Sequence, residues 1–160
     1  MKTILAPIDF SAMTEAVLAE ASLLAHALGG HVVLLTVIQP PTVVAEYAPL
    51  LQDIAEITAA GEKAAAMKLA KMQEKLRSEF IECETVQLVG APTAHILAEA
   101  ERTGADYIVM GSHGHTALYD LLVGSTTHGV LSRAACPVIV IPAATSGRAA
   151  KREKERAASV

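Results

Sequence analysis

The chain has 160 residues, the length of one ordinary domain, and carries a formal net charge of −4 at neutral pH. Hydrophobic residues make up 52% of it, but aromatic residues only 3%, with no Trp. The acidic balance argues against a nucleic-acid partner, and the shortage of rings argues against a stacking platform for single strands. No apolar run approaches the roughly 20 residues of a membrane span, so no membrane partner is expected.

The cysteines and the N-terminus favour a reduced, cytoplasmic compartment. Cys83 and Cys136 are too few for a disulfide framework or a metal site, and are interpreted as small apolar residues. Asp9 interrupts the apolar stretch at the N-terminus, which makes that stretch too short for a signal peptide. We therefore expect a cytoplasmic protein.

The first part of the chain predicts two buried strands with a helix between them. Residues 3–8 form a short apolar run, and Ser11 is placed to cap the helix that follows. Gly29 and Gly30 are expected to end this helix. The next run, 31–38, is nearly all apolar and rich in Val, as in a strand covered on both faces. The apolar stripe expected for the helix consists of Ala16, Leu23, Leu24 and Ala27.

The middle of the chain predicts a loop over 39–49 and a long helix from about 53 to 80. A third strand over 84–89 follows, and then a helix over 93–102 that Thr93 caps and Gly104 ends. The apolar positions of the long helix recur at spacings of three and four and are Ala65, Leu69, Met72, Leu76 and Phe80.

The last third predicts a strand over 106–110, a glycine-rich segment, a helix to about residue 133, and a fifth strand over 137–141. This alternation predicts the α/β class, with a single open five-stranded parallel sheet and helices on both faces. Ligands bind such sheets at the carboxyl ends of the strands, where the strand order reverses. Residues 1–145 are thus expected to form one nucleotide-binding domain, and 146–160 a charged, flexible tail.

The glycine-rich segment carries the main functional signal. It contains Gly111, Gly114 and Gly124, followed by the hydroxyl residues of 125–127. Glycines let the backbone approach a phosphate, and the N–H groups at a helix start favour an anion. The segment lacks the Gly-Lys-Ser/Thr of a P-loop, and the dinucleotide fingerprint would follow the first strand. It therefore predicts a phosphate-binding loop of another kind.

Two imidazoles, His113 and His115, lie in this loop. They are candidates for neutral donors to a phosphate; the alternative is that they are surface residues of a glycine-rich turn. Because residues 103–132 contain no Lys or Arg, the phosphate charge must be met by backbone dipoles, hydroxyls, imidazoles or a metal ion. We expect Mg²⁺ or Mn²⁺, bound mainly by the phosphates rather than at a protein metal site.

The spacing Gly-x2-Gly-x9-Gly-Ser, which ends at Gly124-Ser125, resembles the ATP-binding motif of the universal stress protein family. ILAPIDFS at 4–11, LTVI at 35–38, GAP at 90–92 and CPVIV at 136–140 also match that family, so the resemblance covers residues 2–142. It implies an adenine-nucleotide α-hydrolase-like sheet of order 3-2-1-4-5.

The resemblance also implies a binding site for ATP, or for ADP or AMP. Asp9 would lie by the ribose and adenine, and the backbone around Pro7 and Val37 would line the adenine pocket. Residues 110–116 would wrap the ribose and inner phosphates, and 125–127 would hold the outer phosphates. The expected cofactor-binding residues are Pro7, Asp9, Val37, Met110, Gly111, Ser112, His113, Gly114, His115, Thr116, Gly124, Ser125, Thr126 and Thr127.

The leading functional hypothesis is a regulatory stress-response module that binds ATP and signals to an unidentified protein partner. The alternative is a slow ATPase or a nucleotidyl-transfer enzyme, and a third is a structural dimer whose glycines only permit tight packing. Adenylating relatives of this architecture place Ser-Gly-Gly after the first strand, where this chain has Asp-Phe-Ser-Ala at 9–12. No catalytic constellation is visible, so binding is favoured over a dedicated activity.

The fifth strand is expected at an edge of the sheet, where it predicts a homodimer. Its side chains have high β-propensity and carry no charge, so no charged side chain opposes its pairing with a strand of another chain. The resemblance points the same way, since many members of the family dimerise through this strand in antiparallel fashion. The alternative is a core strand covered by the tail. The residues expected at the interface are Val138, Ile139, Val140 and Ile141.

Overall fold

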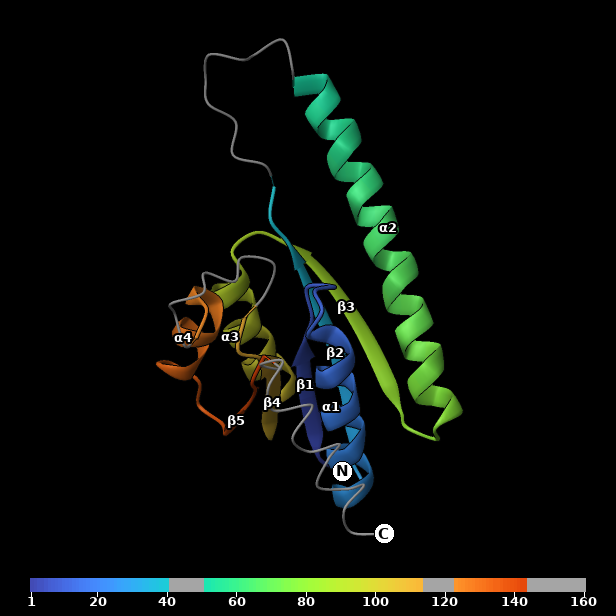
Figure 1. Ribbon diagram of the computed structural model, residues 1–160, viewed down its shortest axis with the longest axis vertical. Coiled ribbons are helices and arrows are strands. Elements are labelled where there is room, and N and C mark those ends of the chain that lie inside the picture. The colour runs from blue at the N-terminus through green and yellow to red at the C-terminus, as the bar shows by residue number, and fades with distance from the viewer. Residues whose placement is uncertain (41–50, 114–122, 144–160) are drawn as a thin grey trace, which may run out of the picture.

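The computed structural model describes residues 1–40, 51–113 and 123–143 (Figure 1). Most of the predicted loop over 39–49 and the whole predicted tail over 146–160 lie outside the described residues. The described elements are, in chain order, β1 (Thr3–Pro7), α1 (Thr14–Leu28), β2 (His31–Ile38), α2 (Leu51–Ser78), β3 (Cys83–Val89), α3 (Pro92–Thr103), β4 (Tyr107–Gly111), α4 (Ser125–Leu131) and β5 (Val138–Ile141).

The strands form one parallel sheet in the order β3-β2-β1-β4-β5, which confirms the predicted fold class. β1 is the central strand: Leu5 lies opposite Val33 of β2 on one side and Ile108 of β4 on the other. The chain first builds β2 and β3 on one side of β1, and then β4 and β5 on the other. The strand order therefore reverses between β1 and β4, which is where open α/β sheets bind ligands.

Helices α1 and α2 cover one face of the sheet, and α3 and α4 cover the other (Figure 1). Ile4 packs in one core cluster with Val17 of α1 and Leu69 of α2. Its neighbour Leu5 packs in a second cluster with Ile96 of α3. Successive strand residues point to opposite faces, so a strand covered on both faces must be apolar throughout. This is why the apolar strands β1, β2 and β4 could be predicted to within one or two residues.

The start of α1 differs from the prediction. The helix begins at Thr14 with Met13 at the N-cap position, and no side chain caps it. The hydroxyl of Ser11 accepts a hydrogen bond from the N–H of Met13 at 3.3 Å, in the turn before the helix. The end at Gly29 is as predicted, since this residue has the left-handed backbone (φ 59°) that favours glycine.

The start of α3 differs in the same way. Pro92 takes a first-turn position, where its fixed φ suits the helix and its missing N–H is not needed. Ala91 is therefore the N-cap residue, and Thr93 lies inside the helix. Gly104 ends α3 as predicted, with a left-handed backbone (φ 60°).

The predicted apolar stripe of α1 is wrong. Leu23 is 63% exposed, Ala16 and Ala27 are also exposed, and Leu24 is half-buried. A helical spacing shows that a face exists, but this helix carries so many Ala and Leu residues that more than one face fits. The residues of α1 that are buried are Thr14, Val17, Leu18, Ala21 and Ala25.

The predicted stripe of α2 is correct except at its end. Ala65, Leu69 and Leu76 are buried, and Met72 is half-buried. Phe80 lies beyond the last helical residue, where its backbone is left-handed (φ 62°), and its side chain is 98% exposed. The chain has already turned away from the helix, so the spacing no longer places this residue on the packed face.

Neither cysteine forms a disulfide, and Cys83 is buried. Burial raises the pKa of the Cys83 thiol to about 11, so the thiol stays protonated at neutral pH. This is the behaviour of a small apolar side chain rather than of a reactive group. Of the helices described, none is long and apolar enough to cross a membrane.

Candidate nucleotide site

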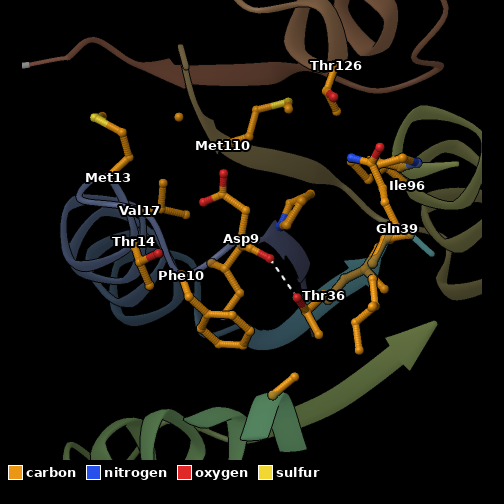
Figure 2. Close-up of a pocket in the computed structure, with 18 of the residues that line it drawn as sticks. Asp9, Phe10, Met13, Thr14, Val17, Thr36, Gln39, Ile96, Met110 and Thr126 are labelled. Atoms are coloured by element: carbon orange, nitrogen blue, oxygen red, sulfur yellow. Dashed lines mark hydrogen bonds between the residues drawn. The ribbon is translucent and has the colours of Figure 1, made fainter. Parts of the chain in front are cut away.

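A cavity of about 560 Å³ lies at the carboxyl ends of β1, β2 and β4 (Figure 2). Pro7 is the last residue of β1, Val37 is the last but one of β2, and Met110 and Gly111 are the last two of β4. All four line the cavity. The carboxyl ends of parallel strands share one edge of the sheet, so residues distant in sequence meet here. The volume lies within the range of small-molecule sites.

The segment after β1 places a carboxylate in the cavity. The buried hydroxyl of Thr36 donates a hydrogen bond to the carbonyl oxygen of Ile8 at 2.9 Å, which holds the end of β1 against β2. Asp9 comes next in the chain. Figure 2 shows its carboxylate pointing toward Met110, on the side away from Phe10. A ligand in the cavity would therefore meet this carboxylate.

Phe10, the next residue, has a left-handed backbone with φ 60°, which is rare for a bulky side chain. The N–H of Ser11 donates a hydrogen bond to Oδ1 of Asp9 at 3.0 Å and closes the turn across Phe10. The ring packs against the α1–α2 core cluster, and the Nζ atom of Lys68 lies 5.0 Å from its centroid. Backbone strain of about 1–3 kcal/mol persists where the surroundings fix the conformation, and such strain clusters at ligand sites.

Helix α2 contributes a wall of the cavity that the sequence analysis missed. Gly61, Ala64, Ala65 and Lys68 line it, at the spacing of a single helix face. Lys68 is exposed, and no carboxylate of the described residues lies within ion-pair distance of its Nζ. The site thus has a cation although residues 103–132 contain none. The sequence did contain a signal for the position of Lys68, because this residue follows the predicted core residue Ala65 by about one helical turn and so lies on the same side of the helix.

Two glycines of the predicted phosphate loop line the cavity, Gly111 and Gly124. A Cβ atom on Gly111 would lie 3.0 Å from the Cβ of Met13 and 3.2 Å from the carbonyl oxygen of His113, so a side chain here would force these neighbours to shift by a few tenths of an ångström. A Cβ on Gly124 would lie 3.4 Å from the carbonyl oxygen of Ser112, an ordinary contact. Both glycines therefore contribute main-chain atoms to the cavity wall.

The hydroxyl residues at the start of α4 divide into two kinds. Ser125 is exposed, Thr126 is half-buried, and both line the cavity. Thr127 also lines it but is only 3% exposed, and its hydroxyl donates a hydrogen bond to the carbonyl oxygen of Gly111 at 2.8 Å. The hydrogen of this hydroxyl is therefore used to hold α4 against β4. Ser125 and Thr126 are the better placed donors to a ligand.

Ser112 is buried and does not line the cavity. Its N–H donates to the carbonyl oxygen of Ile141 at 2.8 Å, and its own carbonyl oxygen accepts the N–H of Gly124 at 2.7 Å. Its hydroxyl oxygen accepts the N–H of Ala143 at 3.0 Å and lies 3.0 Å from Nδ1 of His113, which lines the cavity. Ser112 thus supports the site from behind.

The cavity brings together most of the predicted site residues. Of the rest, Ser112 lies behind the wall, and Gly114, His115 and Thr116 fall outside the described residues. Among the described residues, no group of three or more His, Cys, Asp or Glu could hold a metal ion. The predicted residues that line the cavity are Pro7, Asp9, Val37, Met110, Gly111, His113, Gly124, Ser125, Thr126 and Thr127. Lining residues that were not predicted include Phe10, Met13, Thr14, Val17, Gln39, Lys68 and Ile96.

Curated relatives match part of the chain. Universal stress protein MJ0577 of Methanocaldococcus jannaschii is 35% identical over 74 residues, which are 46% of this chain and 46% of that protein. Universal stress protein YxiE of Bacillus subtilis is 33% identical over 73 residues, 46% of this chain and 49% of its own length. The chain thus spans about half the length of these curated relatives in the alignments.

Solved structures match nearly the whole chain. The structure of MJ0577 aligns with a TM-score of 0.81 at 30% identity, covering 91% of this chain and 98% of that one. UspA of Lactobacillus plantarum aligns with a TM-score of 0.79 at 27% identity over 88% and 97%. A universal stress protein of Archaeoglobus fulgidus in complex with dAMP aligns with a TM-score of 0.62 at 26% identity over 88% and 98%. The profile of the universal stress protein family matches residues 1–142, and the chain therefore belongs to that family.

Proposed function

We propose that this protein binds an adenine nucleotide, ATP or its relatives ADP and AMP, in the cavity, and acts as a cytoplasmic regulatory module in the response to stress. The observation that carries the proposal is the composition of the cavity wall. Aliphatic residues at the ends of β1 and β2, including Pro7 and Val37, offer a surface for a base. The main chain of Gly111 and the hydroxyl of Thr126 offer donors for phosphate, and Gly124, whose own N–H is bonded to the Ser112 carbonyl oxygen, leaves the wall without a side chain.

A related protein supports the same ligand class. The Archaeoglobus fulgidus protein that was solved with dAMP has the same fold and is 26% identical to this chain. For this chain, an adenine base would be held by aliphatic packing and main-chain hydrogen bonds, since aromatic residues make up only 3% of the sequence. Phe10 is the aromatic side chain of the described wall and would add a ring to that packing.

The charges of the wall bear on the metal ion. ATP is a polyanion, and Asp9 adds a negative charge to the site while Lys68 supplies a positive one. One flexible ammonium does not balance a triphosphate, so we expect Mg²⁺ or Mn²⁺ to enter with the nucleotide. The phosphates would supply most of its ligands, with Asp9 as the carboxylate within the wall.

The edge of the sheet at β5 supports a second element of the proposal, a homodimer. Among the described strands, β5 pairs with β4 on one side and has no partner on the other. None of its side chains, Val138 to Ile141, carries a charge. An uncharged edge strand is a template for pairing with another chain. The dimer, with an unidentified protein partner, would carry the signal of nucleotide occupancy.

The test is to identify the nucleotide and then to block the site. Mass spectrometry of the protein purified without added nucleotide should detect an adenine nucleotide. Gly124→Val should then weaken ATP binding at least tenfold, roughly 1.4 kcal/mol. The backbone at this position (φ −66°, ψ 159°) accepts any residue, and a Cβ makes only ordinary contacts, so the variant should fold. Gly114→Val, in the part of the loop outside the described residues, is expected to act similarly.

Unchanged calorimetric affinity in a folded Gly124→Val variant would contradict the proposal. Thermal unfolding of both proteins is the control for folding. Phosphate release in the same wild-type sample measures hydrolysis, and sustained turnover that Gly124→Val abolishes would favour the slow ATPase over the binding module.

A further inference from the structure

We propose that Ser112 is a positioning residue that fixes the tautomer of His113. Its hydroxyl holds the neutral imidazole with the proton on Nε2, so that the ring is a hydrogen-bond donor to the phosphates of a bound nucleotide. The phosphate part of this inference rests on the proposed function. The tautomer itself rests only on the hydrogen bonds around Ser112.

The argument begins with the single hydrogen of the Ser112 hydroxyl. The oxygen accepts the N–H of Ala143 at 3.0 Å, and a backbone N–H can only donate. Among the described residues, the other polar atom in contact with this oxygen is Nδ1 of His113, at 3.0 Å. If Nδ1 also carried a proton, the oxygen would accept two hydrogen bonds and its own hydrogen would have no acceptor among these contacts. A buried donor without a partner is costly, so this arrangement is disfavoured.

The opposite arrangement satisfies both the Ser112 hydroxyl and Nδ1 of His113. The hydroxyl donates to Nδ1, Nδ1 acts as an acceptor, and the neutral ring must then carry its proton on Nε2. The tautomer of a histidine is set by the hydrogen bond that its other ring nitrogen makes. The chain of bonds runs from the N–H of Ala143 through the hydroxyl of Ser112 to the ring of His113.

The main chain keeps Ser112 in place. Its N–H is bonded to Ile141 at the end of β5, and its carbonyl oxygen is bonded to the N–H of Gly124, the N-cap residue of α4. The residue is only 5% exposed. Its hydroxyl therefore has little freedom to turn toward solvent, while the following residue, His113, lies in the cavity wall. A fixed serine behind a histidine in the wall is suited to orienting that ring.

The first experiment reads the tautomer in the nucleotide-free protein. Nitrogen-15 chemical shifts of the imidazoles, recorded where the rings are neutral and assigned by loss of signal in His113→Gln, distinguish Nδ1–H from Nε2–H. We expect His113 to be predominantly Nε2–H in the wild type and a mixture of tautomers in Ser112→Ala. Ser112→Thr keeps the hydroxyl and should keep the wild-type tautomer. A wild-type ring protonated on Nδ1 would overturn the inference, and this result needs no variant of Ser112 to fold.

The second experiment is a double-mutant cycle on ATP affinity with Ser112→Ala, His113→Ala and the double variant. We expect each single change to weaken binding by roughly three- to tenfold, as for the loss of one ordinary hydrogen bond. Ser112→Ala should have no further effect once His113 is absent. A full, additive loss in the His113→Ala background would overturn the positioning role. If wild-type protein binds no ATP, the proposed function fails, and the tautomer experiment still decides the role of Ser112.

Discussion

The Nζ atom of Lys68 lies 5.0 Å from the centroid of the Phe10 ring, and both residues line the cavity. This contact joins α2 to the segment that follows β1. It brings a positive charge to a site whose own loop has no Lys or Arg in residues 103–132. A cation over an aromatic face in an exposed site contributes about 0.5–1 kcal/mol, so the ammonium can leave the ring for a better partner.

Lys68→Ala should therefore weaken ATP binding by roughly three- to tenfold at low ionic strength, and the loss should shrink as salt screens the charge. The loss should be smaller for adenosine, which has no phosphate. Lys71→Ala is the matched control, because Lys71 is on the same helix, is exposed and does not line the cavity. Calorimetric titrations at two salt concentrations check this. Equal losses for the two variants would mean that only the net charge of the protein matters.

Thr126 and Thr127 offer a matched pair in which binding and stability should separate. Thr127→Val removes the hydroxyl that bonds the Gly111 carbonyl in a buried position, and should lower the free energy of unfolding by about 1–3 kcal/mol. Thr126→Val removes a hydroxyl of the cavity wall and should weaken ATP binding with little change in unfolding. Urea denaturation measures the free energy of unfolding of each variant, and calorimetry measures its ATP affinity. A loss of stability in Thr126→Val equal to that in Thr127→Val would refute the division of roles.

Chelation tests the expected metal ion. With Lys68 as the cation of the described cavity wall, ATP affinity should fall several-fold when Mg²⁺ is removed with EDTA. AMP, with a single phosphate, should be much less affected. Equal ATP affinities with Mg²⁺ and with EDTA would mean that the protein balances the phosphate charge alone.

The strands could be predicted because their signals are local. A strand buried on both faces must be apolar along nearly its whole length, as 31–38 is, and the β–α alternation leaves few topologies. The glycine spacing predicted that Gly111 and Gly124 lie at the site, and both line the cavity. This prediction needs no tertiary information, because a glycine contributes only main-chain atoms wherever it lies.

What could not be predicted depends on contacts between distant segments. Nothing in the sequence near Lys68 says that α2 passes over the turn at Phe10, or that this turn is left-handed. The motif resemblance placed Ser112 at the ligand, but the hydrogen bonds to the end of β5 turn its side chain to the inside. In both cases the tertiary arrangement decides which way a polar side chain points.

Asp106 ties the start of β1 to the start of β4 at the end of the sheet opposite the cavity. Its carboxylate accepts bonds from Nζ of Lys2 at 2.7 Å and from the N–H of Thr3 at 2.8 Å, and these bonds lower the pKa of the carboxyl. Because the carboxyl has a lower pKa in the folded state than in the unfolded state, its ionisation stabilises the fold at every pH above the unfolded-state pKa. This stabilisation is lost as the pH falls through the folded-state pKa. Asp106→Asn should thus be less stable than wild type at pH 7, with the difference vanishing in strong acid. Denaturation at a series of pH values checks this; a gap that persists at acid pH would contradict it.

The proposed dimer can be tested at the main chain of β5. The N–H of Ile108 donates to the carbonyl oxygen of Pro137 at 3.0 Å, and the N–H of Ser112 donates to that of Ile141 at 2.8 Å. The odd-numbered residues of β5 therefore direct their N–H and C=O groups toward β4. Successive residues of a strand direct these groups to opposite sides, so the groups of Val138 and Val140 point outward from the edge.

Val140→Pro is the sharpest variant that this geometry allows. It removes an N–H that points away from β4, and proline is tolerated in an edge strand where its nitrogen faces outward. The bonds between β4 and β5 should survive, and with them the fold and ATP binding. A partner strand would lose one of its few hydrogen bonds, so light scattering should find monomer at concentrations where the wild type is dimeric. Ile139→Lys is a less clean test, because Ile139 packs against the α1–α2 core cluster and its replacement disturbs the fold itself. A wild-type protein that is monomeric at high micromolar concentration, or a Val140→Pro variant that dimerises as well as the wild type, would show that this edge is not the interface.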